Sequence, residues 1–100
     1  MENLAVKNGA AVLKALGNKK RLEILYHLIG KELKVGELEK RVGLSQSALS
    51  QHLAVLRKEN IVKTRREAQT IYYSLKSELA VKIMKQLNNF YNMPYKSTDI

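Results

Sequence analysis

The sequence predicts a mainly α-helical domain that contains one small β-hairpin. Apolar residues recur at three- and four-residue steps over most of the chain, whereas residues 61–75 alternate or are rich in β-branched and aromatic types. A length of 100 residues, with 45% hydrophobic and 27% charged residues, suits a single compact unit. We therefore expect one domain at residues 1–92 and a mobile tail at residues 93–100, because Pro94 prevents the last helix from continuing.

Two helices are expected before residue 30. Residues 3–16 carry apolar side chains at helical spacing, and Gly17 ends this helix. Asn18 suits the N-cap of a second helix over residues 19–29, because its side chain can accept a hydrogen bond from an unpaired first-turn amide. Gly30 can end that helix in the left-handed conformation.

A pair of helices joined by a short turn is expected next. Apolar spacing indicates a helix at residues 35–42, which Gly43 ends. Ser45 is the expected cap of the following helix, whose apolar stripe is formed by Leu49, Leu53 and Leu56. Two helices this close around a glycine, the second with a polar outer face, are typical of a helix-turn-helix.

The alternating residues 61–67 and the run at residues 70–75 are expected to pair as a hairpin that turns around Glu67, Ala68 and Gln69. A last helix follows at about residues 77–91. The resulting order, two helices, a helix-turn-helix, a basic hairpin and a final helix, is that of a winged helix-turn-helix. In that fold one helix enters a DNA groove and the hairpin contacts the flanking backbone.

The charge of the chain favours a polyanionic partner. Eighteen Lys and Arg residues against nine Asp and Glu residues give a net charge of +9. Five cations lie between residues 57 and 66, with Glu59 as the one anion among them, and phosphate contact is the natural use of such a cluster at a wing. A solvated face is the alternative. The expected contacts to the DNA backbone come from Arg57, Lys63, Arg65, Arg66, Gln69 and Thr70.

The outward face of the helix after Ser45 carries Gln46, Ser47, Ser50 and Gln51. Gln can pair bidentately with adenine and Ser can bond a base edge or a phosphate, so this face can read a major groove; an ordinary polar helix surface is the alternative. His52 has two interpretations as well. Its neutral form suits partial burial within the fold, and its charged form suits contact with a DNA phosphate.

Several function classes are excluded or disfavoured. The chain has no cysteine, which excludes a disulfide framework, thiolate metal ligation and a nucleophilic thiol. No apolar run reaches the 18 or so residues of a membrane span, so we expect no membrane partner and a cytoplasmic, nucleoid-associated protein. We expect no enzymatic activity, because Ser50 and His52 point about 200° apart on a helix and no glycine-rich phosphate loop is present.

The core Ser47-Ala48-Leu49-Ser50-Gln51-His52-Leu53, together with the strand Ile71-Tyr72-Tyr73-Ser74-Leu75, resembles the ArsR/SmtB family of bacterial winged-helix repressors. The resemblance covers about residues 10–91 and includes the entry to the second helix at Leu16-Gly17-Asn18. It implies a homodimeric repressor that binds double-stranded DNA at an inverted-repeat operator. It also implies that Ser47, Ser50, Gln51 and His52 fall where family members contact DNA.

The chain departs from the family's known sensor sites. The positions of the Cys-x-Cys pair hold Lys34 and Gly36, and residues 77–91 contain Glu78 but no histidine. A transition-metal site needs three or four ligands, so we expect neither a metal nor a cofactor. The residues do not identify a small-molecule effector. Asn60 and Ala68 stand where family members often have glycine, and since alanine tolerates positive φ poorly, we expect a different type of wing turn.

The first and last helices expose apolar residues over more than one stripe, which predicts a dimer interface. A two-fold site requires recognition helices about 34 Å apart, which favours this interpretation over completion of one monomer's core. The expected interface residues are Leu4, Leu13, Leu79, Ile83, Leu87, Phe90 and Tyr91. A winged helix that binds RNA or a protein partner is the alternative function.

Overall fold

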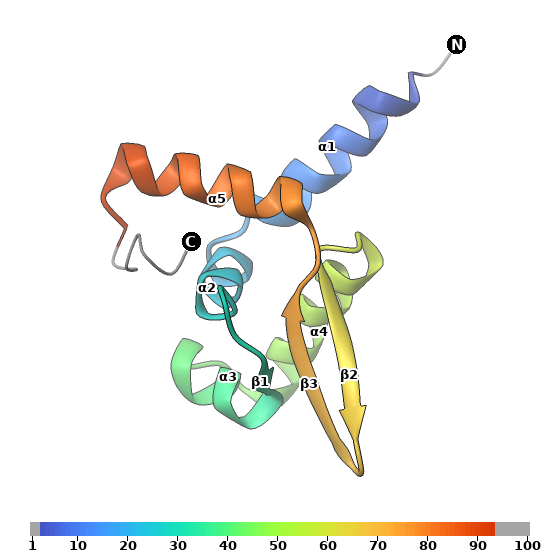
Figure 1. Ribbon diagram of the computed structural model, residues 1–100, viewed down its shortest axis with the longest axis vertical. Helices are drawn as coiled ribbons and strands as arrows, with labels where there is room; N and C mark the ends of the chain where they lie inside the picture. The colour runs from blue at the N-terminus through green and yellow to red at the C-terminus, as the bar shows by residue number, and fades with distance from the viewer. Residues whose placement is uncertain (1–2, 94–100) are drawn as a thin grey trace.

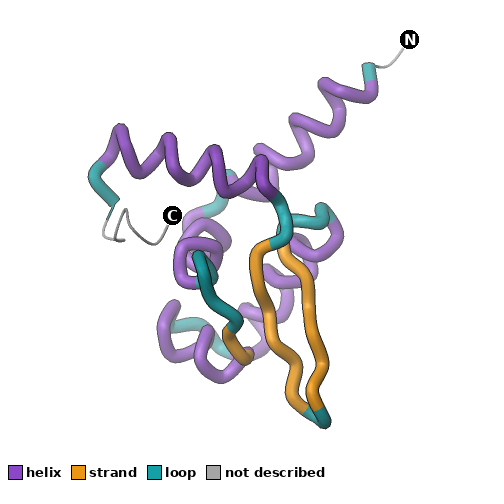
Figure 2. The backbone as a smooth tube through the Cα atoms, viewed as in Figure 1, coloured by secondary structure: helices purple, strands orange, loops and turns teal. Residues whose placement is uncertain are grey.

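Five helices and a three-stranded antiparallel sheet make up residues 3–93, which are the residues that the computed structural model describes. The elements, in chain order, are α1 (Leu4–Leu16), α2 (Lys19–His27), β1 (Leu33–Lys34), α3 (Val35–Val42), α4 (Gln46–Lys58), β2 (Val62–Glu67), β3 (Thr70–Leu75) and α5 (Glu78–Tyr91) (Figure 1). This arrangement is the predicted winged helix-turn-helix. Helices α1 and α5 lie at one end of the long axis, and α3 and the tip of the hairpin lie at the other (Figure 2).

Side-chain caps start four of the helices. The Asn18 Oδ1 accepts a hydrogen bond from the Arg21 amide, and the Ser45 Oγ accepts one from the Ala48 amide, as the sequence predicted. Asn3 and Ser77 cap α1 and α5 in the same way. Helix α2 ends at His27, two residues earlier than expected, because the chain leaves the helix through Leu28 before Gly30 takes its left-handed φ of 67°.

The helix-turn-helix is fixed to the core through one face of each helix. Gly43 ends α3 in the left-handed conformation at a φ of 67°, and α4 starts three residues later. The stripe of Leu49, Leu53 and Leu56 is buried, which orients the opposite face of α4 outward. Across the core, the Tyr26 hydroxyl donates a buried hydrogen bond of 2.7 Å to the Met84 carbonyl oxygen and so ties α2 to α5.

The sheet has a strand that the sequence did not indicate. Strand β1 pairs antiparallel with β3 at Leu33 and Lys34, giving the strand order β1-β3-β2. Two residues are too short to show alternation, so only the tertiary pairing reveals this strand. The hairpin pairs Val62 with Leu75 at its base and Glu67 with Thr70 at its tip.

The wing turn differs from the expectation for alanine. Ala68 has a φ of 55° and Asn60 a φ of 57°, so both residues adopt the left-handed conformation that favours glycine. The prediction that alanine would avoid this conformation is therefore wrong. The full register of six residue pairs in the hairpin fixes the turn, at a cost of about 1–2 kcal/mol for a residue with a Cβ.

Helix α5 ends at Asn92, which has a φ of 48°. Met93 is half-buried and packs against the core, and the rest of the expected tail, residues 94–100, lies outside the described residues. Within residues 3–93, every helix is too short or too polar to cross a membrane.

Candidate nucleic-acid interface

The outer face of α4 presents polar side chains at the positions that the sequence predicted. Gln46, Ser47, Ser50 and Gln51 are all exposed, while the opposite face of the helix is buried. The Ser47 Oγ lies 3.5 Å from the Ser45 Oγ at the cap. The side chains of Gln46, Ser50 and Gln51 make no hydrogen bond to any residue in the described range, so their donors and acceptors are available to a ligand.

His52 is half-buried beside this face. Burial lowers the pKa of His52 below its usual value of 6.5, and the charge of Arg21 lowers it further. The imidazole is therefore neutral at pH 7 in the free protein. This protonation state agrees with the interpretation of His52 as a partly buried residue, and a phosphate placed against the ring would have to raise the pKa.

We expect the free energy of unfolding to fall as the pH is lowered below 6.5. Burial lowers the pKa of both His27 and His52 in the folded state, so the unfolded chain binds protons more readily and stability is lost between the unfolded and folded pKa values. Urea unfolding at pH 7.5 and pH 5.5, at one protein concentration, measures this loss. The variant His52→Gln should show a smaller loss than the unmodified protein, and an unchanged pH dependence in both His52→Gln and His27→Gln would contradict the assignment.

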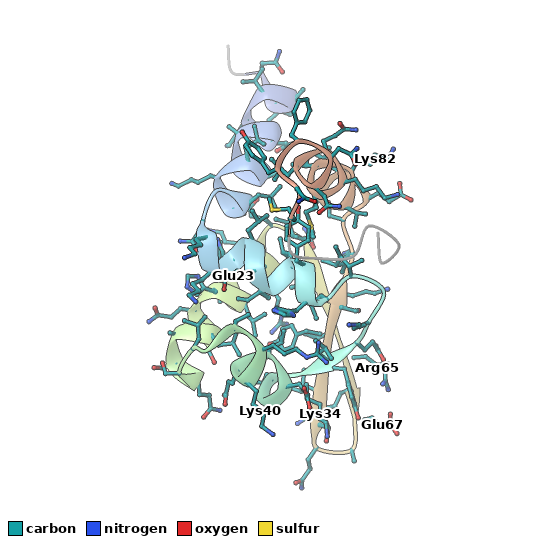
Figure 3. All side chains as sticks on the ribbon, turned by 90° about the vertical axis from the view of Figure 1, so that its left-hand side faces the viewer. Glu23, Lys34, Lys40, Arg65, Glu67 and Lys82 are labelled. Atoms are coloured by element: carbon teal, nitrogen blue, oxygen red, sulfur yellow. The ribbon has the colours of Figure 1, made fainter. Side chains whose placement is uncertain are left out.

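The cations on β2 are not equivalent. Lys63, Arg65 and Arg66 are all exposed, but Arg65 is held by two carboxylates. Its Nη2 lies 2.9 Å from Glu32 Oε1, its Nε also donates to Glu32, and its Nη1 lies 2.8 Å from Glu67 Oε2. The guanidinium also stacks over the Tyr72 ring at 4.5 Å from the centroid. Figure 3 shows Arg65 and Glu67 at the same edge of the wing.

This arrangement changes the electrostatics of the wing. The carboxylates raise the pKa of Arg65, and Arg65 in turn lowers the pKa of Glu32. Arg65, Glu32 and Glu67 together carry one net negative charge, so this group weakens rather than strengthens the attraction for phosphate. Arg66 and Lys63 form no ion pair within the described residues and remain the available cations of β2.

The other residues predicted to contact the DNA backbone lie at the end of α4 and at the turn between β2 and β3. Arg57 is exposed in the last turn of α4, Gln69 is exposed at the wing turn, and Thr70 beside it is half-buried. Spacing along α4 could identify its outward polar face. Only the fold could show that Glu32, 33 residues away in the chain, forms an ion pair with Arg65.

The predicted interface residues form an exposed apolar surface on α1 and α5. Phe90 is 81% exposed, Tyr91 71%, Leu4 67%, Leu13 59% and Leu79 51%. Ile83 and Leu87 are half-buried, and Ile83 also packs against the core. Val6, in the first turn of α1, was not among the predicted interface residues but is 68% exposed. Figure 2 shows that the N-terminal part of α1 projects from the body of the molecule. The described residues contain no cluster of three His, Asp or Glu side chains that could hold a metal ion.

Comparisons with known proteins agree with this fold. A family model described as "Bacterial regulatory protein, arsR family" matches residues 18–64. The nodulation protein NolR of Rhizobium meliloti is 55% identical over 82 residues, which are 82% of this chain and 67% of that protein. The transcriptional activator HlyU of Vibrio cholerae is 50% identical over 88 residues, with 85% of this chain and 82% of that protein covered.

The crystal structure of NolR from Sinorhizobium fredii superposes with a TM-score of 0.84 at 47% identity, covering 91% of this chain and 97% of that one. The matched family consists of transcriptional regulators and not of enzymes. On this identity and coverage, the chain belongs to the ArsR family of bacterial regulatory proteins.

Proposed function

We propose that this protein is a homodimeric, sequence-specific DNA-binding regulator, and a repressor as the family resemblance implies. It reads an inverted-repeat operator with α4 in the major groove and with the wing on the flanking backbone. The observation that carries the proposal is the exposed, unpartnered set of Gln46, Ser50 and Gln51 on a helix whose other face is buried. One relative, HlyU, is named as an activator, so the position of the operator relative to the promoter decides between repression and activation.

The chemistry of α4 suits base readout. A glutamine side chain can donate to adenine N7 and accept from the adenine N6 amino group in one bidentate contact, and a serine hydroxyl can bond a base edge or a phosphate. Because Leu49, Leu53 and Leu56 anchor the helix, these polar groups are held in a fixed orientation. Arg57 and Arg66 then supply phosphate contacts on either side, which set the register without reading sequence.

The exposed apolar surface supports a dimer. Leu79, Ile83, Leu87 and Phe90 recur at four- and three-residue steps and so share one side of α5, while the buried Ala80 and Met84 lie on another. Helix α1 adds Leu4, Val6 and Leu13. An exposed apolar surface of this kind is typical of a subunit interface, and a two-fold dimer places two copies of α4 on the two half-sites.

The proposal includes neither a metal nor another cofactor. Lys34 and Gly36 stand at the Cys-x-Cys positions of the family's metal sensors, and neither can ligate a soft metal. A DNA-binding regulator of this kind acts in the cytoplasm in association with the nucleoid.

The test begins with selection of bound fragments from the source genome at physiological salt, with random duplex as competitor. We expect an inverted repeat to be enriched, with an affinity at least about a thousandfold above that for random DNA. Weak, steeply salt-dependent binding without enrichment would refute the proposal and favour RNA or a protein partner.

Point variants then test the division of roles. Gln51→Ala or Ser50→Ala should cost about 1–3 kcal/mol on the operator and relax the preference at individual base pairs, because each removes a contact to a base edge. Arg66→Ala should weaken operator and random duplex alike and reduce the salt slope by about one per protomer, because it removes a phosphate contact. Fluorescence anisotropy titrations over a range of salt concentrations measure both effects. Equal losses on operator and random DNA for all three variants would contradict the assignment.

A further inference from the structure

Helix α5 has a third face, which borders the apolar surface and carries two lysines. Lys82 and Lys85 are three residues apart and lie about 100° and 160° around the helix from Ile83, on the side away from the buried Met84. Both lysines are exposed. A dimer formed through the apolar side of α5 would therefore leave Lys85 open to solvent and place Lys82 at the rim of the interface, because Lys82 also lines a hollow with Ile83, Leu87 and Phe90.

These lysines belong to a larger basic surface. Lys76, Lys82 and Lys85 surround a hollow of about 410 Å³ at the start of α5. Lys31 and Lys63 border a second hollow of about 360 Å³ on the sheet, and Leu75 lines both hollows, which joins them into one surface. We refer to Lys31, Lys63, Lys76, Lys82 and Lys85 as the lateral lysine patch. Figure 3 shows Lys82 of α5 and Arg65 of the wing on the same side of the molecule.

The positive charge of this patch is not compensated. Within the part of the chain that the structure describes, none of the five lysines forms an ion pair. The lining includes two carboxylates, Glu78 and Glu32, and Glu32 is already paired with Arg65. By contrast, Glu32 and Glu67 neutralise the charge of Arg65 on the wing through their ion pairs with it. Much of the free positive charge beside the wing therefore lies on the patch, away from the α4 face.

We propose that the lateral lysine patch binds the phosphate backbone of duplex DNA that flanks the operator. The inference rests on the proposed function and extends it from the operator to the neighbouring DNA. Continuity decides for DNA over another polyanion. Lys63 and Arg66 lie on opposite faces of the same strand, so a duplex groove that holds the wing places one of its backbones on the Lys63 side, next to the patch. In a dimer, the two patches would contact the flanking duplex on the two sides of the operator, one patch on each side.

Flanking DNA reaches the patch by bending toward α5. Bending 20–30 base pairs by 40–90° costs about 1–6 kcal/mol, which contacts between lysines and phosphates can offset. Lysine suits this role because its ammonium group is a mobile point charge that follows the backbone without a fixed geometry. The contact adds affinity and salt dependence but no sequence preference.

The experiment compares the operator, once selected, in a duplex of about one operator length with the same operator at the centre of a 60-base-pair duplex. The patch variant is Lys82→Gln with Lys85→Gln, and the control is Lys14→Gln with Lys19→Gln, which removes the same charge from exposed lysines outside the patch. Glutamine keeps helix propensity, and circular dichroism confirms folding. Anisotropy titrations from 50 to 300 mM salt give affinities and salt slopes.

We expect the unmodified dimer to bind the long duplex more tightly and with a steeper salt slope than the short one. The patch variant should lose about two to four units of slope on the long duplex, because four lysines per dimer are removed, and nothing on the short duplex. The control should leave the difference between the two duplexes intact. Equal binding of both duplexes by the unmodified protein, or an equal loss in the control, would overturn the inference. A single-stranded RNA that competes for the patch more strongly than a flanking duplex does would also overturn the inference. Failure to bind the short operator would instead overturn the proposed function itself.

Discussion

Replacement of Leu79 and Phe90 by glutamate should give a folded monomer whose affinity for the inverted-repeat operator is about 10²–10⁴ lower than that of the dimer. Leu79 is 51% exposed and Phe90 81% exposed, so neither side chain contributes much to the core of its own protomer. In a dimer, however, both would lie in the interface, where a buried unpaired carboxylate is strongly unfavourable. A monomer binds one half-site at a time and loses the effective concentration that linkage supplies.

Sedimentation velocity gives the oligomeric state, and titration with one half-site and with the full operator separates loss of linkage from loss of contact. The double variant Leu79→Gln and Phe90→Gln is the matched control, because it keeps the net charge at +9 and so removes apolar contact without repulsion from DNA. The glutamine variant should also shift the equilibrium from dimer to monomer. A dimer of undiminished stability in the glutamate variant would show that α5 is not the interface.

The second large effect concerns the attachment of α4 to the core. Leu49→Ala should lower the free energy of unfolding by about 2–5 kcal/mol, because Leu49 is fully buried and its truncation leaves a cavity between α4 and the rest of the core. For a domain of this size each kcal/mol corresponds to about 4–8 °C in Tm. Leu49 is also the neighbour of Ser50, so the loss of packing should loosen the orientation of the side chains that we propose to read bases.

Val55→Ala is the control for this prediction, because it lies on the same helix but is 38% exposed. We expect Val55→Ala to lower the free energy of unfolding by less than about 1 kcal/mol, since surface substitutions have small effects. Thermal unfolding must be compared at one protomer concentration, because dimer formation contributes to the measured stability. Equal shifts in Tm for the two variants would contradict the role of Leu49 as the anchor of α4.

The helices and their order follow from local features of the sequence. The caps at Asn18 and Ser45, the left-handed glycine at position 43 and the stripe of Leu49, Leu53 and Leu56 act within a few residues of one another. Such short-range interactions can be read directly from the chain, and they were sufficient to predict the winged helix-turn-helix. The exposed polar face of α4 could be identified for the same reason, because helical spacing fixes which side chains lie opposite the buried stripe.

The charge distribution was decided by the tertiary structure. The sequence places Arg65 in a run of cations, but the fold brings Glu32 from 33 residues away and engages its guanidinium. Strand β1 likewise exists only because β3 supplies its hydrogen-bonding partner. The lateral lysine patch combines Lys31, Lys63 and Lys82 from three distant segments. Local spacing thus determined which elements form and which of their faces are polar. Long-range packing determined which charges neutralise each other and which remain free to bind DNA, because electrostatic energy depends on distance in space and not on separation along the chain.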